Sequence, residues 1–342
     1  MEIKGDLCHE LLAKSIKPAL SFDETKDYAQ WKNSIQEKLL ELAGINKIAA
    51  NACPLQLTIE SDEMKDGYRQ IRFVFESEKG AFVPCYLLIP DTGKAKYPVA
   101  ITLQGHSTGF HNSIGQIKYP ERDESYQPRG AFALQAVKNG FAALAIEQRG
   151  MGERSTSRHD YNGPLMCTYT AMTAVQLGRT LLGERMWDVS KAIDLLPTFE
   201  QLDTDKIVLT GNSGGGTMTW YASCFDERIK IAVPSCAFCS YETSILDIFH
   251  CPCNYIPNAF EWFEMQDLAC MLAPRNLVVV TGKDDPIFPI GGVKNSFATV
   301  EKIYAKAGFA DQCRLVVTPM AHWWCEDIIW NAVKEEAEKL GW

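Results

Sequence analysis

Apolar side chains recur at helical spacing in the first part of the chain. In residues 28–40 they recur about four residues apart, and Gly44 then interrupts the pattern. We therefore expect residues 1–50 to form an N-terminal helical extension in front of one large domain that spans residues 51–342.

From Gln70 onward the apolar pattern changes to that of β-strands. Two apolar runs, residues 71–75 and 82–89, flank a turn at Lys79-Gly80, which predicts a β-hairpin. Pro84 lacks an N–H group, so the second run suits an edge strand.

After Pro98, short apolar runs and amphipathic stretches alternate along the chain. The expected strands are residues 99–103, 141–146, 206–210, 229–233, 276–281 and 314–318, and the expected helices are residues 131–138, 169–196, 217–222, 293–307 and 326–340. The longest helix has apolar positions spaced by 7, 4, 3, 4 and 3 residues before Pro197 ends it. This alternation predicts the α/β class: a mostly parallel, twisted sheet of about eight strands with helices on both faces.

One segment, residues 235–272, breaks the alternation. It is irregular and rich in aromatic residues: Phe238, Tyr241, Phe249, Tyr255, Phe260, Trp262 and Phe263. Because it follows a strand in the carboxyl half of the sheet, we expect an inserted cap that shapes a substrate pocket. A subdomain that only packs against the core is the alternative.

The strand expected at residues 206–210 ends in a motif with chemical meaning. Residues 207–217 read IVLTGNSGGGT, an apolar run followed by G-x-S-x-G and then by a helical stretch. In a nucleophile elbow this tight strand-to-helix turn holds a serine in a strained conformation and exposes its hydroxyl. The context favours Ser213 as a nucleophile over an ordinary Gly/Ser loop.

A serine hydroxyl needs a histidine to accept its proton and an acid to orient that histidine. Of the six histidines, His322 follows the last expected strand, where the base belongs in the chain order Ser, Asp, His. Two acids, Asp284 and Asp285, follow the strand at 276–281. Asp285 is favoured by its distance of three residues from Gly282, and Asp284 stays the alternative.

Acyl transfer also needs N–H donors for the oxyanion. The main-chain N–H of Gly214 is one, and that of His106, in the loop after the strand at 99–103, is the best second donor by position. The His106 imidazole is expected to line the pocket. Further pocket residues are expected from the neighbouring loops and the cap: Gln104, Phe238, Tyr255, Trp262 and Trp323.

Composition narrows the partners. The chain has a net charge of −9, which disfavours nucleic acid and anionic membranes as partners. The first residues have no basic and apolar leader pattern, so we expect a cytoplasmic protein whose 12 cysteines are reduced and mostly buried. The expected partner is a small-molecule ester, and assembly into a homo-oligomer stays open.

Taken together, these segments resemble the α/β-hydrolase superfamily from about Gln70 to the C-terminus. The closer resemblance is to bacterial acetyl xylan esterases and dienelactone-hydrolase-like esterases. It rests on these strings: QGH at 104–106, EQRGMGERS at 147–155, LLGERMWD at 181–188, GNSGGG at 211–216, CPCNYIP at 251–257 and APR at 273–275. The resemblance implies a serine esterase for acetyl-type or sugar esters that uses Ser213, His322 and Asp285 and no cofactor.

Two positions depart from the pattern of this group. Gln104 stands where relatives often have histidine, and Glu147 where aspartate is frequent, both near the loops that position substrate. Arg149 matches the Arg-Gly turn of the group and is expected to brace loops through bidentate hydrogen bonds.

Other functions fit parts of the same sequence. A serine peptidase or amidase of the same fold and a non-catalytic ligand-binding relative are the alternatives. Thiol and imidazole groups at short spacing also suit zinc, and five residues form such a pattern: Cys236, Cys239, His250, Cys251 and Cys253. Because this spacing matches no standard zinc motif, we expect buried thiols and no metal.

Overall fold

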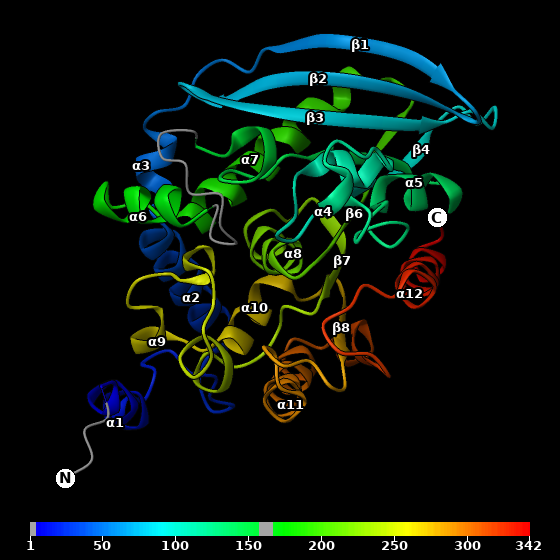
Figure 1. The fold of residues 1–342 in the computed structure, drawn as a ribbon. Coiled ribbons are helices and arrows are strands. Elements are labelled where there is room, and N and C mark those ends of the chain that lie inside the picture. The colour runs from blue at the N-terminus through cyan, green and yellow to red at the C-terminus, as the bar shows by residue number, and fades with distance from the viewer. Residues whose placement is uncertain (1–4, 157–166) are drawn as a thin grey trace.

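A nine-stranded sheet forms the centre of the computed structural model, which describes residues 5–156 and 167–342 (Figure 1). The strands are β1 (Leu57–Lys65), β2 (Tyr68–Glu78), β3 (Ala81–Pro90), β4 (Tyr97–Leu103), β5 (Ala142–Ile146), β6 (Leu202–Asn212), β7 (Ile229–Ser235), β8 (Asn276–Gly282) and β9 (Cys313–Thr318). Their order is β1-β2-β3-β5-β4-β6-β7-β8-β9. Strands β4 to β9 pair in parallel, which confirms the predicted sheet type.

The ninth strand, β1, was not expected from the sequence. Its residues read LTIESDEMK, and most of their side chains are exposed, so it carries little apolar signal. It is held by antiparallel pairing to β2, which continues into the predicted hairpin of β2 and β3. β3 also pairs with β5, which corrects the edge position expected from Pro84. The β5 pairing spans Cys85 to Leu88 and stops short of Pro84, so the missing N–H leaves no gap in that ladder.

Helices cover both faces of this sheet. They are α1 (Leu7–Ser15), α2 (Tyr28–Ala43), α3 (Ile45–Ala49), α4 (Pro120–Asp123), α5 (Phe132–Lys138), α6 (Thr168–Gln176), α7 (Leu181–Leu195), α8 (Gly214–Phe225), α9 (Ala259–Trp262), α10 (Ala269–Leu272), α11 (Ile290–Lys306) and α12 (Glu326–Lys339). Alternate side chains of each central strand enter different cores. Leu277 and Val279 of β8 pack on the side of α7, α8 and α11, whereas Val278 and Val280 pack on the side of α5 and α12. Full burial of each such side chain stabilises the fold by about 1.5–3 kcal/mol.

The single helix expected at residues 169–196 is instead two helices, α6 and α7. The break falls at Gly178, whose φ of +67° is a left-handed conformation that favours glycine. Thr180 then caps α7 by accepting a hydrogen bond from the N–H of Gly183 at 2.9 Å. The seven-residue gap between Val175 and Leu182 in the apolar stripe coincides with this break.

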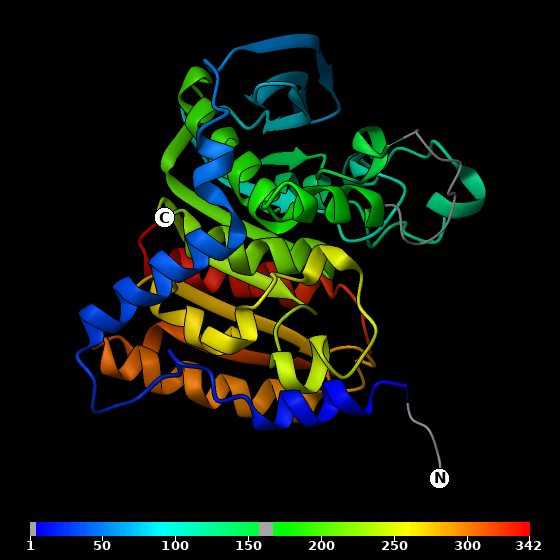
Figure 2. The ribbon, with the colours of Figure 1, turned by 90° about the vertical axis from the view of Figure 1, so that its left-hand side faces the viewer.

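Helices α2 and α3 of the N-terminal region pack onto the main core, whereas α1 has no buried residue. Trp31, Ile35, Leu39 and Ala43 of α2 are buried in the same hydrophobic cluster as the side chains of the sheet. Figure 2 shows α2 and α3, in blue, crossing in front of the sheet on this side. Residues 1–4 of the expected extension lie outside the described part of the chain. Among the described residues, none of the helices has both the length and the apolar composition needed to cross a bilayer.

Candidate active site

Ser213 lies at the turn between β6 and α8, at the carboxyl end of a central parallel strand. Its φ of 57° and ψ of −124° are strained for a residue with a side chain, as a nucleophile elbow requires. The strain is held in place on both sides. The Ser213 N–H donates to the carbonyl of Ser235 on β7, and the Ser213 carbonyl accepts from the N–H of Thr217.

The glycines around Ser213 are required by close packing. A Cβ atom on Gly215 would lie 2.0 Å from the carbonyl oxygen of Leu103, and one on Gly211 would lie 2.5 Å from the same oxygen. Any side chain at these positions would push α8 away from β4. The small residues of the motif therefore allow the sharp turn that exposes the serine hydroxyl.

The structure brings His322 and Asp285 together. Nδ1 of His322 lies 2.8 Å from Oδ2 of Asp285, whose side chain is fully buried. The other carboxylate oxygen of Asp285 accepts the N–H groups of Ile287 and Phe288 at 3.0 and 3.1 Å. Nε2 of His322 is buried and has no hydrogen-bond partner within the described residues. The imidazole is thus oriented by an acid and presents a bare nitrogen.

The alternative acid, Asp284, points away from this arrangement. Its side chain is 68% exposed and pairs only loosely with Lys283, at 3.8 Å. Of the two acids left open by the sequence, Asp285 alone contacts the histidine.

The loop after β4 lies directly against the elbow. A Cβ atom on Gly105 would be 2.7 Å from the carbonyl oxygen of Asn212 and 3.0 Å from Cβ of Ser213. This contact brings the main chain of His106 close to the nucleophile. Gly214 is the first residue of α8, where N–H groups have no acceptor within the helix. Both expected donors are therefore placed near Ser213.

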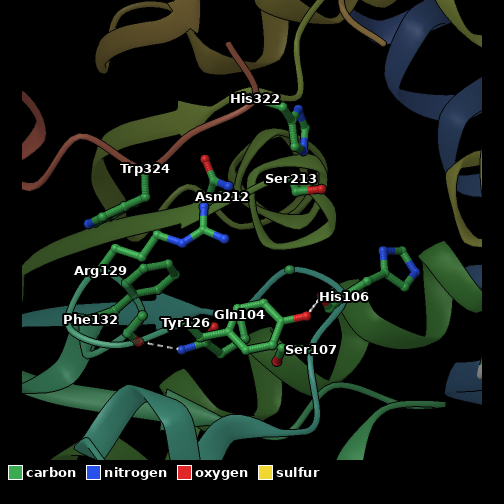
Figure 3. Close-up of a pocket in the computed structure, with 12 residues that line it drawn as sticks. Gln104, His106, Ser107, Tyr126, Arg129, Phe132, Asn212, Ser213, His322 and Trp324 are labelled. Atoms are coloured by element: carbon green, nitrogen blue, oxygen red, sulfur yellow. Dashed lines mark hydrogen bonds between the residues drawn. The ribbon is translucent and has the colours of Figure 1, made fainter. Parts of the chain in front are cut away.

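Ser213 and His322 line a cavity of about 180 Å³ (Figure 3). Its lining residues are Gln104, Gly105, His106, Ser107, Tyr126, Arg129, Gly130, Phe132, Asn212, Ser213, His322 and Trp324. A second cavity, of about 90 Å³, opens at Ser213 and is lined by His106, Ser213, Gly214, Phe249, His250, Cys251, Asn254, Ile287 and Phe288. Four of these residues come from the segment between β7 and β8, which contains the expected cap. Ser213 and His106 therefore border both cavities.

Arg129 is a pocket residue that the sequence reasoning missed. Figure 3 shows its side chain extending into the larger cavity toward Asn212. Its guanidinium lies 3.6 Å from the ring centroid of Trp323, and its Nε atom is buried without a hydrogen-bond partner. Among the described residues no carboxylate pairs with it, and burial lowers its pKa. Only the fold indicates this role, because Arg129 lies in a loop without a motif.

The pocket residues expected from the sequence have different outcomes. Gln104 lines the larger cavity, but its amide is held by Ser113 and the carbonyl of Gly130, both at 2.7 Å. Trp323 is 40% exposed and stacks on Arg129, but it lines neither cavity at Ser213, which corrects its assignment; its neighbour Trp324 lines the larger one. His106 is among the residues that line both cavities.

Three aromatic residues of the expected cap do not reach either cavity at Ser213, which corrects their assignment. Phe238 is 1% exposed and packs in the core against Trp220. Tyr255 donates its hydroxyl to the carbonyl of Ile245 and faces α1 across a groove. Trp262 packs against α2, with the Lys38 ammonium 3.9 Å from its ring centroid. Phe238 and Trp262 thus use their apolar surface for packing against the main core.

Arg149 has the bracing contacts expected of it. Its guanidinium binds both carboxylate oxygens of Asp188 on α7, at 2.9 and 2.8 Å, and Glu78 on β2 at 2.7 Å. Burial alone would raise the pKa of Asp188, but Arg149 and Arg154 hold it well below its ordinary value. Arg149 lines neither cavity at Ser213 and links the loop after β5 to α7.

Glu147, at the start of the same loop, is a buried carboxyl. Burial raises its pKa to about 7, although the N–H groups of Phe110 and Glu153 donate to it at 3.2 Å. Glu147, which stands where aspartate is frequent in relatives, thus has a pKa near neutrality and lies in the loop after β5.

The five thiol and imidazole residues singled out in the sequence do not form one group. Cys236 lies near Asp285 and His322, Cys239 contacts Thr243, and His250 contacts Ser244. Cys251 and Cys253 instead meet two residues that the sequence did not connect with them. These are His106 and Cys167, from the loop after β4 and the start of α6.

The sheet order, the strained serine and the acid-linked histidine define the α/β-hydrolase class. In agreement, the model of the Abhydrolase family matches residues 4–238. This match covers more than half of the chain, so the chain belongs to that family. The matched segment includes Ser213 and His106, and it ends before Asp285 and His322.

Known proteins agree with this placement. A candidate hydrolase of Bacillus subtilis (strain 168), YtaP, is 26% identical over 244 residues, which cover 70% of this chain and 77% of YtaP. A candidate acetyl xylan esterase from Bacteroides fragilis NCTC 9343 superposes with a TM-score of 0.78 at 17% identity, covering 98% of this chain and 95% of that one. A glucuronoyl esterase from Solibacter usitatus gives a TM-score of 0.64 at 14% identity, with 95% and 98% covered. At these identities the structural likeness shows the fold.

Proposed function

We propose that this chain is a serine hydrolase that cleaves small carboxylic esters of acetyl or sugar-ester type through an acyl-enzyme. One observation carries the proposal. Ser213, strained at its elbow, faces the same cavity as His322, whose Nδ1 atom lies 2.8 Å from the buried carboxylate of Asp285. This arrangement supplies a nucleophile, a base and an orienting acid.

In the proposed reaction, Oγ of Ser213 attacks the ester carbonyl carbon while Nε2 of His322 accepts the hydroxyl proton. Asp285 holds the imidazole and stabilises the imidazolium. The oxyanion accepts hydrogen bonds from the main-chain N–H groups of Gly214 and His106, each contributing roughly 10²- to 10³-fold in rate. His322 then protonates the leaving alkoxide, and a water activated by the same imidazole releases the acid.

The two cavities support a small substrate with a polar alcohol. At about 180 and 90 Å³ they are well below the roughly 300–1,000 Å³ of sites for drug-sized ligands. We assign the acyl group to the smaller cavity, which Gly214 lines, and the alcohol to the larger one. The larger cavity offers the Tyr126 hydroxyl, the Asn212 amide and the Arg129 guanidinium, which suit the hydroxyl groups of a sugar. The structural neighbours named as esterases of sugar substrates support the same choice.

The test is hydrolysis of p-nitrophenyl acetate, butyrate and octanoate by wild type and by Ser213→Ala at equal purity. We expect kcat/KM to fall with acyl length, because the smaller cavity excludes long chains. Ser213→Ala should lose roughly 10⁴-fold or more in kcat, since its nucleophile is absent. Acetylated xylo-oligosaccharides then test the alcohol.

Two results would contradict the proposal. Equal activity of Ser213→Ala would assign the chemistry to another group. No activity of the wild type on any ester would favour a peptidase or amidase, tested with p-nitroanilides, or a ligand-binding relative.

A further inference from the structure

Four soft ligand atoms converge beside the smaller cavity. Nε2 of His106 and the Sγ atoms of Cys167, Cys251 and Cys253 all lie within 4.8 Å of one another. The imidazole nitrogen is 3.3 Å from Cys167 Sγ and 3.4 Å from Cys253 Sγ. All three cysteines are free thiols. We call this set the thiol cluster.

We propose that the thiol cluster binds one divalent zinc ion with Cys₃His coordination. Tetrahedral zinc, with Zn–S bonds of about 2.3 Å and Zn–N bonds of about 2.0–2.1 Å, separates its ligand atoms by roughly 3.5–3.8 Å. The two distances from Nε2 of His106 to sulfur, 3.3 and 3.4 Å, are close to this spacing. Thiolate and imidazole ligands favour zinc over magnesium and calcium, which prefer oxygen.

The ligands are held by the surrounding fold. Cys251 and Cys253 belong to a tight Cys-Pro-Cys turn in which the N–H of Asn254 donates to the Cys251 carbonyl at 2.9 Å. The Asn254 side chain accepts the Thr217 hydroxyl of α8 at 2.9 Å, which ties the turn to the elbow helix. Gly150 lies against Cys167, where an added Cβ would be 2.9 Å from Cys167 Cβ. A site with this support costs little reorganisation on binding.

Burial and ligand number make this a structural site. Cys167 and Cys253 are 0% and 2% exposed, and the four protein ligands leave no open position for substrate or water. The ion would join three segments that are far apart in the sequence: the loop after β4, the start of α6, and the segment between β7 and β8. His106 also carries the proposed oxyanion N–H, so zinc at its imidazole would fix that donor. The ring of His106 would then act as a positioning group for its own main-chain N–H.

The first experiment measures metal content, which does not depend on esterase activity. Protein expressed without a polyhistidine tag is purified under reductant and examined by elemental analysis and native mass spectrometry. We expect one zinc per chain. Cys251→Ser, which alters the partly exposed ligand, and Cys253→Ser should each reduce zinc content by tenfold or more. Cys239→Ser, a buried cysteine outside the cluster, should keep one zinc per chain.

A second measurement uses the wild type alone, in case a cysteine variant misfolds. Zinc is removed with dipicolinate under reductant and replaced by cobalt(II). Visible absorption bands of tetrahedral thiolate-bound cobalt support the proposal. The proposal is overturned if the reduced wild type holds no zinc and takes up none on titration. It is equally overturned if Cys251→Ser and Cys253→Ser both retain full zinc, or if peptide mapping finds a disulfide among Cys167, Cys251 and Cys253 in the purified protein.

Discussion

Two groups of side chains adjoin the nucleophile elbow, and they are assembled differently: the thiol cluster and a second group, Ser213, Asp285 and His322, which we call the strand-end cluster. Ser213, Asp285 and His322 each follow a parallel strand, β6, β8 and β9, so the sheet itself places them at one edge. The thiol cluster is assembled by three loops that fold back on one another. The residues of a site built on strand ends occur along the chain in the order of the strands, so a sequence pattern can find them. The residues of a site built on loops have no regular spacing along the chain, and only the folded structure shows them together.

The largest expected effect separates the two acids of the strand-end cluster. Asp285→Asn should lower kcat for p-nitrophenyl acetate by about 10⁴-fold, because the amide no longer holds the imidazole in the productive tautomer. The exposed Asp284→Asn, made as the matched control, should stay within about twofold of wild type, since surface substitutions have small effects. A large loss in Asp284→Asn with little loss in Asp285→Asn would exchange their roles.

This contrast also explains what could be predicted from the sequence. The parallel sheet, the elbow, His322 and Asp285 follow from apolar runs and the residues directly after them. The break at Gly178 and the polar strand β1 were missed because turn geometry and backbone pairing decide them, and neither leaves an apolar pattern. The smaller cavity at Ser213 depends on the loop between β7 and β8.

The remaining errors in the predicted pocket residues have one cause: in irregular segments the sequence does not show which side chains face the pocket. An irregular aromatic segment does not reveal which rings face the core, so Phe238 was assigned to the pocket although it packs beside Trp220. Arg129 was missed for the converse reason, since its loop has no motif. Cys167 lies 84 residues before Cys251, and only the folded chain brings the two together.

The second prediction tests whether zinc bound at the thiol cluster stabilises the fold. Removing zinc with a chelator should lower the melting temperature by more than about 5 °C, because metal binding contributes directly to the folding free energy of the loops it joins. Differential scanning fluorimetry with and without added zinc measures this. Cys239→Ser treated in the same way should show the same shift. An unchanged melting temperature on full removal would mean that the ion does not support the fold.

The third prediction concerns the pH dependence of stability that the buried carboxyl of Glu147 causes. Burial raises the pKa of Glu147 to about 7 from an ordinary 4.5, so between these values the folded state binds more protons than the unfolded state. The contribution of protonated Glu147 to the free energy of unfolding is fully present below pH 4.5. As pH rises to 7, this free energy falls by roughly 2–3 kcal/mol. Glu147→Gln stays neutral and should remove this loss. Urea unfolding at pH 5 and pH 8 compares the two, and parallel losses in both proteins would contradict the assignment.

The smallest expected effect concerns Arg129, which lines the larger cavity at Ser213. Arg129→Gln should lower kcat/KM for an acetylated sugar by about tenfold, since a hydrogen bond from a charged group contributes about 1.5 kcal/mol or more. It should change kcat/KM for p-nitrophenyl acetate less, because that alcohol has no hydroxyl groups. Arg122→Gln, an exposed change of equal charge on α4, is the control. Equal losses on both substrates would indicate a general effect on the fold.

The central claim, that Ser213 is an activated nucleophile, is tested most directly by labelling with a fluorophosphonate and locating the label by peptide mass spectrometry. Stoichiometric modification of Ser213 in the wild type is predicted, with much slower labelling in Asp285→Asn because the base is no longer oriented. Labelling at another residue, or unmodified Ser213 in folded protein after prolonged exposure to the reagent, would contradict the claim.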